Sequence, residues 1–225
     1  MYGIRPNVVI GFHGCDEDVR DALLTNPHDI QPSEKPYDWL GNGVYFWEND
    51  PYRAMEWAKR KEERGEIKKA SIIGAVLYLG HCCDFLDRGS ITTLASFYEL
   101  MELGYAAIGK KMPINKDVND DEHQDKLLRY LDCAAIEYMH EKMLEDYQED
   151  ITTHGISNRR LFDSARGVFT EGGEAFPGAG LAAKSHIQIC IRNLNCIKGF
   201  FLPRQEEDFY TKLADSYNQK KLKAQ

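Results

Sequence analysis

Short apolar runs that are typical of β-strands lie near both ends of this 225-residue chain, and a long stretch of helical periodicity separates them. Buried strands are predicted at residues 7–14, 41–47, 71–79, 167–170, 186–191 and 196–202. Helices are predicted from Asp16 to Leu24 and from Pro51 to Arg64, because an aspartate cap and a proline suit a first helical turn. Since strands and helices do not alternate regularly, we expect an α+β fold without βαβ repeats.

The middle of the chain, at about residues 90–150, is predicted to be a helical insertion packed on the sheet. Its apolar residues are spaced to form one helix face: Leu127, Leu128, Leu131, Ala135, Tyr138 and Met139. The acidic stretch from Asp117 to Glu122 is predicted to be a connecting loop, because it lacks the ligand spacing and glycine of a calcium-binding loop. A charged C-terminal helix is expected at about residues 205–222. With 43% hydrophobic residues, we expect one domain over residues 1–225.

Composition argues against several classes of function. The net charge of −8 gives no overall attraction to nucleic acid, although Arg159, Arg160 and Arg166 leave a local basic patch open. The six cysteines contain no C-x-x-C pair and lack the spacing of a zinc site, so we expect reduced thiols and no metal. No apolar run approaches the roughly 18 residues that cross a bilayer, and residues 1–10 lack the order of a signal peptide. We therefore expect a cytoplasmic protein.

Three segments carry candidate functional residues. His13 and Gly14 end the first predicted strand, and residues 41–46 read Gly-x-Gly-Val-Tyr-Phe at the start of the second. A loop with four glycines and a proline, Glu171 to Gly180, precedes the strand that holds Gln188. Loops of this length are usually functional.

In this order, the three segments resemble the ADP-ribosyltransferases of the diphtheria-toxin and poly(ADP-ribose) polymerase branch. The resemblance covers roughly residues 8–86 and 165–202. It implies two packed, mainly antiparallel sheets around an NAD cleft. It also implies a mono-ADP-ribosyltransferase that cleaves the nicotinamide–ribose bond of NAD and modifies a macromolecular acceptor, a protein rather than a nucleic acid. Family habit further suggests a toxin or defence effector with an antitoxin or chaperone as partner.

The resemblance also implies roles for individual residues. His13 is expected to bind the hydroxyls of the adenosine ribose, and the backbone of Gly14 to bind the nicotinamide carboxamide, since glycine has no side chain in the way. Tyr45 and Trp57 are expected to sandwich the cationic nicotinamide ring. Two further residues are expected at the cofactor site: Cys15 and Gly43. Phe46 and Trp47 are expected to be core residues.

Gln188 occupies the position of the catalytic glutamate in this family, and an amide has neither the charge nor the basicity of a carboxylate. Three explanations are open: the acceptor needs no base, Glu171 or Glu174 of the loop supplies the charge, or the site binds without turnover. We favour the loop glutamates. His186, on the same strand face as Gln188, is either an acceptor-orienting group or base, or a solvent-facing histidine.

Three rival interpretations remain. A transferase acting on RNA or DNA, including tRNA phosphotransferase chemistry, would need arginines near the pocket. A non-catalytic domain would bind NAD, ADP-ribose or a protein. A Cys-His enzyme using Cys15 and His13 is disfavoured, because no third residue is available to orient the pair.

Overall fold

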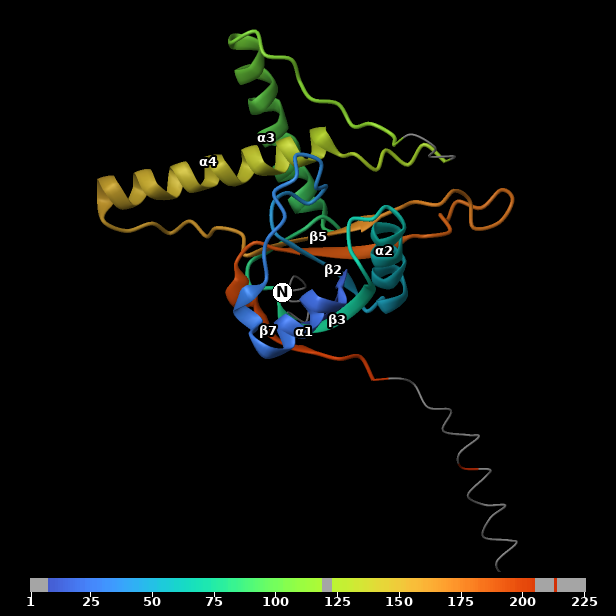
Figure 1. Ribbon diagram of the computed structural model, residues 1–225. Coiled ribbons are helices and arrows are strands. Elements are labelled where there is room, and N and C mark those ends of the chain that lie inside the picture. The colour runs from blue at the N-terminus through green and yellow to red at the C-terminus, as the bar shows by residue number, and fades with distance from the viewer. Residues whose placement is uncertain (1–7, 119–122, 205–212, 214–225) are drawn as a thin grey trace, which may run out of the picture.

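The computed structural model describes residues 8–118, 123–204 and 213 (Figure 1). These residues form an α+β fold with a mixed seven-stranded sheet and four α-helices, so the predicted α+β class is confirmed. The strands are β1 (Val8–Asp16), β2 (Val44–Glu48), β3 (Ala70–Tyr78), β4 (Cys82–Asp84), β5 (Ser164–Phe169), β6 (His186–Ile191) and β7 (Ile197–Phe201). The α-helices are α1 (Glu17–Thr25), α2 (Pro51–Glu63), α3 (Arg88–Ala107) and α4 (Tyr130–His154), and two short 3-10 turns are η1 (Pro27–Asp29) and η2 (Leu194–Cys196).

The sheet is continuous, so the expectation of two packed sheets is wrong. Its strand order is β4-β5-β6-β2-β1-β3-β7, and every neighbouring pair is antiparallel except β4 and β5. The halves join because β2 pairs with β6 on one side and with β1 on the other. The β1–β2 pairing involves Gly11 with Glu48 and Phe12 with Trp47, after which the two strands diverge.

Two hydrophobic cores lie on opposite faces of the sheet. Along β6, Ile189 and Ile191 enter the core that includes Leu23 of α1, whereas Cys190 enters the core beneath α3 and α4. Figure 1 shows α3 and α4 on the side of the sheet away from α1. This alternation decides which β6 residues face the helical insertion.

The helical insertion differs from its prediction in one respect. Leu127 and Leu128 precede α4, and Leu128 forms an isolated bridge with Lys116. The helix begins later because the Asn115 side chain accepts hydrogen bonds from the backbone N–H groups of Leu131 (2.8 Å) and Asp132 (3.4 Å). A cap from a residue this far away has no local sequence signal.

Some predicted elements lie partly or wholly outside the described residues. Residues 119–122 of the acidic stretch lie outside the described residues, and so does the expected C-terminal helix at about 205–222, apart from Leu213. Strand β4 was not predicted, because three residues are too few to display an alternating pattern.

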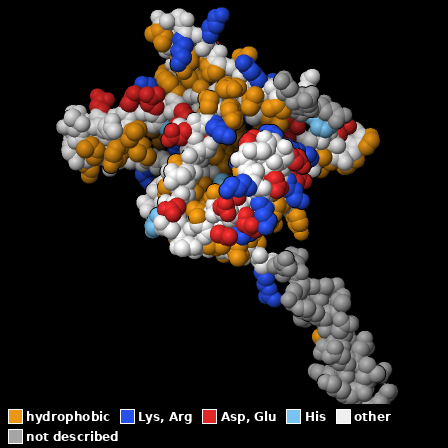
Figure 2. All heavy atoms as spheres, in the orientation of Figure 1, with side chains coloured by type: hydrophobic (Ala, Val, Ile, Leu, Met, Phe, Trp, Pro, Cys, Tyr) orange, Lys and Arg blue, Asp and Glu red, His pale blue; other side chains and the backbone are white. Residues whose placement is uncertain are grey.

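Hydrophobic side chains cover much of the outer surface of α3, where Leu100 and Leu103 are exposed (Figure 2). Among the described residues, no helix is long and apolar enough to span a membrane.

Candidate functional site

Three neighbouring strands place the candidate residues on one face of the sheet. Gln188 of β6 lies opposite Trp47 of β2 and Gly167 of β5, and His186 lies opposite Phe169 of β5. Directly opposed residues point to the same side, so these side chains share a face. The face forms one wall of a cavity of about 540 Å³. Ligand cavities commonly have volumes of about 300–1,000 Å³.

The cavity brings together residues from both ends of the chain. The residues named from the sequence that line it are His13, Gly14, Gly43, Tyr45, Trp57, Glu171, His186 and Gln188. Cys15 is not among the lining residues, because its side chain packs in the hydrophobic core on the α1 side. Burial raises the pKa of the Cys15 thiol to about 11, so it is protonated at neutral pH. Cys15 thus fits neither its expected cofactor-binding role nor the Cys-His alternative.

Gln188 is held by a tryptophan that sequence reasoning missed. Trp39 Nε1 donates a hydrogen bond of 2.7 Å to Gln188 Oε1. Trp39 lies close over Gly167, where a β-carbon would come within 3.0 Å of the indole. The glycine therefore makes room for the ring. Because Oε1 is occupied, the amide N–H₂ of Gln188 is the group left to donate to a ligand.

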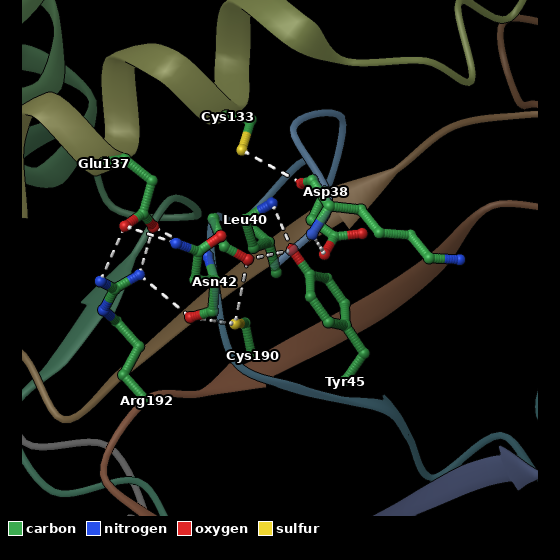
Figure 3. A network of polar contacts seen from close by, with 10 residues as sticks. Asp38, Leu40, Asn42, Tyr45, Cys133, Glu137, Cys190 and Arg192 are labelled. Atoms are coloured by element: carbon green, nitrogen blue, oxygen red, sulfur yellow. Dashed lines mark hydrogen bonds and ion pairs between the residues drawn. The ribbon is translucent and has the colours of Figure 1, made fainter. Parts of the chain in front are cut away.

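Tyr45 has two roles in the wall. Its ring lines the cavity, and its hydroxyl accepts a hydrogen bond from Leu40 N (2.9 Å) and donates one to Gly41 O (2.7 Å) (Figure 3). Burial raises the pKa of the phenol well above its usual value, so it stays neutral. The hydroxyl thereby ties strand β2 to the segment that precedes it.

An ion pair from the helical insertion continues this network. Glu137 of α4 pairs with Arg192, whose Nη2 lies 3.0 Å from Glu137 Oε2. Glu137 also accepts a hydrogen bond of 2.7 Å from Asn42 N, and Arg192 Nη1 donates one of 3.0 Å to Asn42 O (Figure 3). The insertion thus fixes the backbone of the segment that carries Trp39. No local pattern in the sequence indicates this contact, since three distant segments meet there.

His13 and Gly14 lie in β1 just after its last residue paired with β2, Phe12, while their pairing with β3 continues to Asp16. His13 Nδ1–H donates a hydrogen bond of 2.8 Å to the carbonyl oxygen of Tyr45. Burial lowers the pKa of His13, so Nε2 of the neutral ring is available to accept a hydrogen bond. A β-carbon at Gly14 would collide with Ala54 O of α2. The glycine therefore lets α2 approach β1, a packing reason that the sequence did not suggest.

The cavity wall carries a row of aromatic rings. Ring centroids are 6.3 Å apart for Trp57 and Trp47, 6.2 Å for Trp47 and His186, 5.6 Å for His186 and Phe169, and 5.0 Å for Phe169 and Trp39. Trp47 was expected to be a core residue. It is buried, but it also lines the cavity, and its place two residues after Tyr45 was the available signal.

His186 is buried rather than solvent-facing, with 8% of its surface exposed. Its Nδ1–H donates a hydrogen bond of 2.8 Å to Lys184 O, while Nε2 is buried without a hydrogen-bond partner. Burial lowers the pKa of the imidazole, and the positive charge of Arg53 acts in the same direction. The neutral ring therefore presents an unprotonated Nε2.

The two loop glutamates differ in position. Glu171 is 6% exposed, lines the cavity and forms an ion pair with Arg53 of α2. Glu174 is exposed and does not line the cavity; its Oε2 accepts a hydrogen bond of 2.8 Å from Gly178 N. Of the two, Glu171 alone is placed to act in the site as the structure stands.

The arginines named for a nucleic-acid substrate lie elsewhere. Arg166 is paired with Glu48 and Asp84, and neither Arg159 nor Arg160 lines the cavity. The basic residues that do line it are Lys35, Arg53, Arg60, Lys61 and Arg64. Within the described ranges, no group of three or more His, Cys, Asp or Glu residues is arranged to hold a metal ion, and all six cysteines are free.

No protein-family model, curated protein or solved structure matches this chain.

Proposed function

We propose that this protein is a mono-ADP-ribosyltransferase, which cleaves the nicotinamide–ribose bond of NAD and transfers ADP-ribose to a macromolecular acceptor. One observation carries the proposal. His13, Gly14, Tyr45, Trp57 and Gln188, named from separate sequence motifs, line a single cavity. If the short motifs resembled the family only by chance, there would be no reason for these five residues to meet in one cavity.

The aromatic row supports binding of the nicotinamide ring. A flat, positively charged ring is attracted to the faces of tryptophan side chains, and Trp47 and Trp57 stand next to each other on the wall. The resemblance predicts that Trp57 lies across the ring from Tyr45. In the structure, Trp57 of α2 lies next to Trp47 instead. The nicotinamide is therefore placed, in this proposal, between the indoles and the phenol of Tyr45.

The reaction requires charge stabilisation and one proton acceptor. The bond between the nicotinamide nitrogen and ribose C1′ breaks, its electron pair leaves with the neutral nicotinamide, and positive charge develops on the sugar. An acceptor nucleophile then bonds to C1′ and loses a proton. In this proposal the Gln188 amide donates to a ribose hydroxyl, and Glu171 supplies the negative charge that Gln188 lacks.

His186 is assigned as the proton acceptor. Its Nδ1–H is used by Lys184 O, so in this proposal the ring takes the proton of the acceptor on Nε2, a buried atom that the acceptor reaches once neighbouring side chains move. Glu171 is a weaker choice for this step, because its charge is shared with Arg53. The expectation that a loop glutamate compensates for Gln188 is thereby kept for Glu171 and dropped for Glu174.

One rival has an observation in its favour. Gln188 carries no charge, as expected of a domain that binds NAD or ADP-ribose without cleaving it. Incubation with labelled NAD and whole-cell lysate separates the two functions, because a transferase moves label into a macromolecule and a binding domain does not. Protein is the expected destination of the label, and label in nucleic acid would favour the nucleic-acid-directed transferase.

Tyr45→Ala provides the matched test of the site. It removes one wall of the ring pocket, so NAD should no longer raise the melting temperature and transfer should be lost. Tyr52→Ala removes an exposed tyrosine of α2 that does not line the cavity and should behave as the unaltered protein. Absence of both NAD-dependent stabilisation and transfer in the unaltered protein would refute the proposal.

A further inference from the structure

One face of α2 points into the cavity. The aromatic and basic residues of α2 and its C-terminal cap that line the cavity are Arg53, Trp57, Arg60, Lys61 and Arg64, and the acidic Glu63 lines it as well. Their spacing of three and four residues defines a single helix face. The adjacent side of the helix is buried through Ala54 and Ala58 against β1, where Gly14 permits the close approach.

The positive charges on this face are only partly neutralised by acidic residues. Arg53 is paired with Glu171 and Arg64 with Glu66. By contrast, Arg60 and Lys61 form no ion pair with a carboxylate among the described residues, and the same is true of Lys35, which lines the cavity from the segment before β2. Five Lys or Arg side chains and four carboxylates, from Asp38, Glu63, Glu66 and Glu171, therefore line the cavity, and Arg60, Lys61 and Lys35 are the positive ones outside an ion pair.

The surroundings of Lys61 make its positive charge costly without a ligand. Burial lowers the pKa of the Lys61 ammonium, and the nearby positive charges of Lys35 and Arg64 act in the same direction, against the opposing charge of Glu66. Lys61 Nζ lies 5.8 Å from the ring centroid of Trp57, so the charge is adjacent to the aromatic row. An anion bound here would relieve the repulsion between the lysines.

The cavity thus carries an aromatic row that ends at Trp57 of α2 and, next to Trp57, a group of basic residues from the C-terminal half of α2 together with Lys35. We propose that Arg60, Lys61 and Lys35 bind the diphosphate group of the ligand, whose flat ring lies on the aromatic row. This inference rests on the proposed function and deepens it, because it assigns the ligand an orientation: nicotinamide towards Trp47 and diphosphate towards the C-terminal half of α2. Ammonium and guanidinium groups both bind phosphate oxygens through charge-assisted hydrogen bonds.

A second role for these residues predicts a different result. Basic residues in the last turn stabilise a helix by interacting with its dipole, and Arg60 and Lys61 occupy that turn of α2. A contribution of this kind affects the melting temperature without ligand and does not discriminate between ligands. Affinities for two parts of NAD therefore separate the two roles.

The experiment is calorimetric titration with ADP-ribose and, separately, with nicotinamide. Lys61→Met should weaken ADP-ribose binding by about tenfold and leave nicotinamide binding unchanged. Lys59→Met is the matched control, since Lys59 is an exposed lysine of α2 that does not line the cavity, and its affinities should not change. Lys35→Met tests the same site from another segment and should act in the same direction as Lys61→Met. Raising the salt concentration should weaken ADP-ribose binding less in Lys61→Met than in the unaltered protein.

Equal ADP-ribose affinity in Lys61→Met and the unaltered protein would overturn the inference, as would equal weakening for both ligands. Failure of ADP-ribose to bind the unaltered protein would overturn it as well. The proposed function is judged separately from label transfer. If ADP-ribose binding depends on Lys61 but NAD is not cleaved, the diphosphate site stands and the transferase proposal fails. If NAD is cleaved but Lys61→Met binds ADP-ribose normally, the transferase proposal stands and the diphosphate site fails.

Discussion

Two segments border the cavity, residues 33–43 before β2 and residues 171–185 between β5 and β6, and they are held in different ways. The 33–43 segment is bonded to the rest of the protein. Its Trp39 reaches Gln188 of β6, its Asn42 binds Glu137 of α4, and its backbone at residues 40 and 41 binds the Tyr45 hydroxyl.

The 171–185 segment is bonded mainly to itself. Ala175 N donates to Leu181 O and Gly178 N to Glu174, and residues 174–178 are exposed. Its anchors lie at its beginning, where Glu171 pairs with Arg53 and Gly172 N donates to Asp125. The comparison suggests a fixed wall on one side of the cavity and an adaptable one on the other, with Glu171 as the fixed point of the adaptable wall. The four glycines from Glu171 to Gly180 predict that this loop is mobile without ligand.

The largest difference should appear between two glycines with positive φ angles. Gly43 has φ 155°, and a β-carbon there would lie 2.5 Å from Ile191 O; Gly178 has φ 80° and no atom within 4 Å of that position. Gly43→Ala should lower the free energy of unfolding by about 3 kcal/mol or more, and Gly178→Ala by about 1 kcal/mol. Urea denaturation measures both. Similar losses in the two variants would contradict the contrast between the segments.

Removing the ion pair that fixes Asn42 should have the next largest effect. Glu137→Gln loses the charge that Arg192 binds, and should lower the free energy of unfolding by about 1–3 kcal/mol. Glu141→Gln changes an exposed glutamate of the same helix and should be nearly neutral. If the two variants are equally stable, the insertion does not fix the 33–43 segment.

The loop glutamates should separate in the rate of transfer. Glu171→Gln removes the carboxylate that lines the cavity, and should reduce the transfer rate by about tenfold or more with a smaller effect on NAD affinity. Glu174→Gln should change the rate by less than about twofold, since Glu174 bonds within its own loop. A larger loss in Glu174→Gln would mean that the loop rearranges when NAD binds.

A smaller effect concerns acid stability. Burial acts to raise the pKa of Glu137, but hydrogen bonds and the charge of Arg192 outweigh burial, so that the pKa lies below its usual value. The stabilisation from Glu137 is therefore complete above its unfolded-state pKa of about 4.3 and is lost as pH falls through the lower folded-state pKa. The stability difference between the unaltered protein and Glu137→Gln should accordingly shrink over the pH range below about 4.3. A constant difference across that range would show that ionisation of Glu137 is not involved.

Local patterns in the sequence were enough to predict most elements and many of the cavity residues. Strand β6 begins and ends where predicted, Asp16 caps α1, and Pro51 starts α2, because each depends on neighbouring residues. The motifs identified His13, Tyr45 and Gln188, since their positions at strand ends and on strand faces follow from the short-range alternation of a strand.

Tertiary structure alone decided how these elements meet. The joining of β2 to both β1 and β6 made one sheet instead of two. The contacts of Trp39 with Gln188 and of Glu137 with Arg192, and the pairing of Glu171 with Arg53, join residues far apart in the chain. Such contacts depend on where whole elements pack, and they produce no periodic signal in the residues around them. For this reason the sequence named some of the groups that line the cavity, whereas packing added the others, Trp39 and the basic residues of α2 among them, and decided which are free to act.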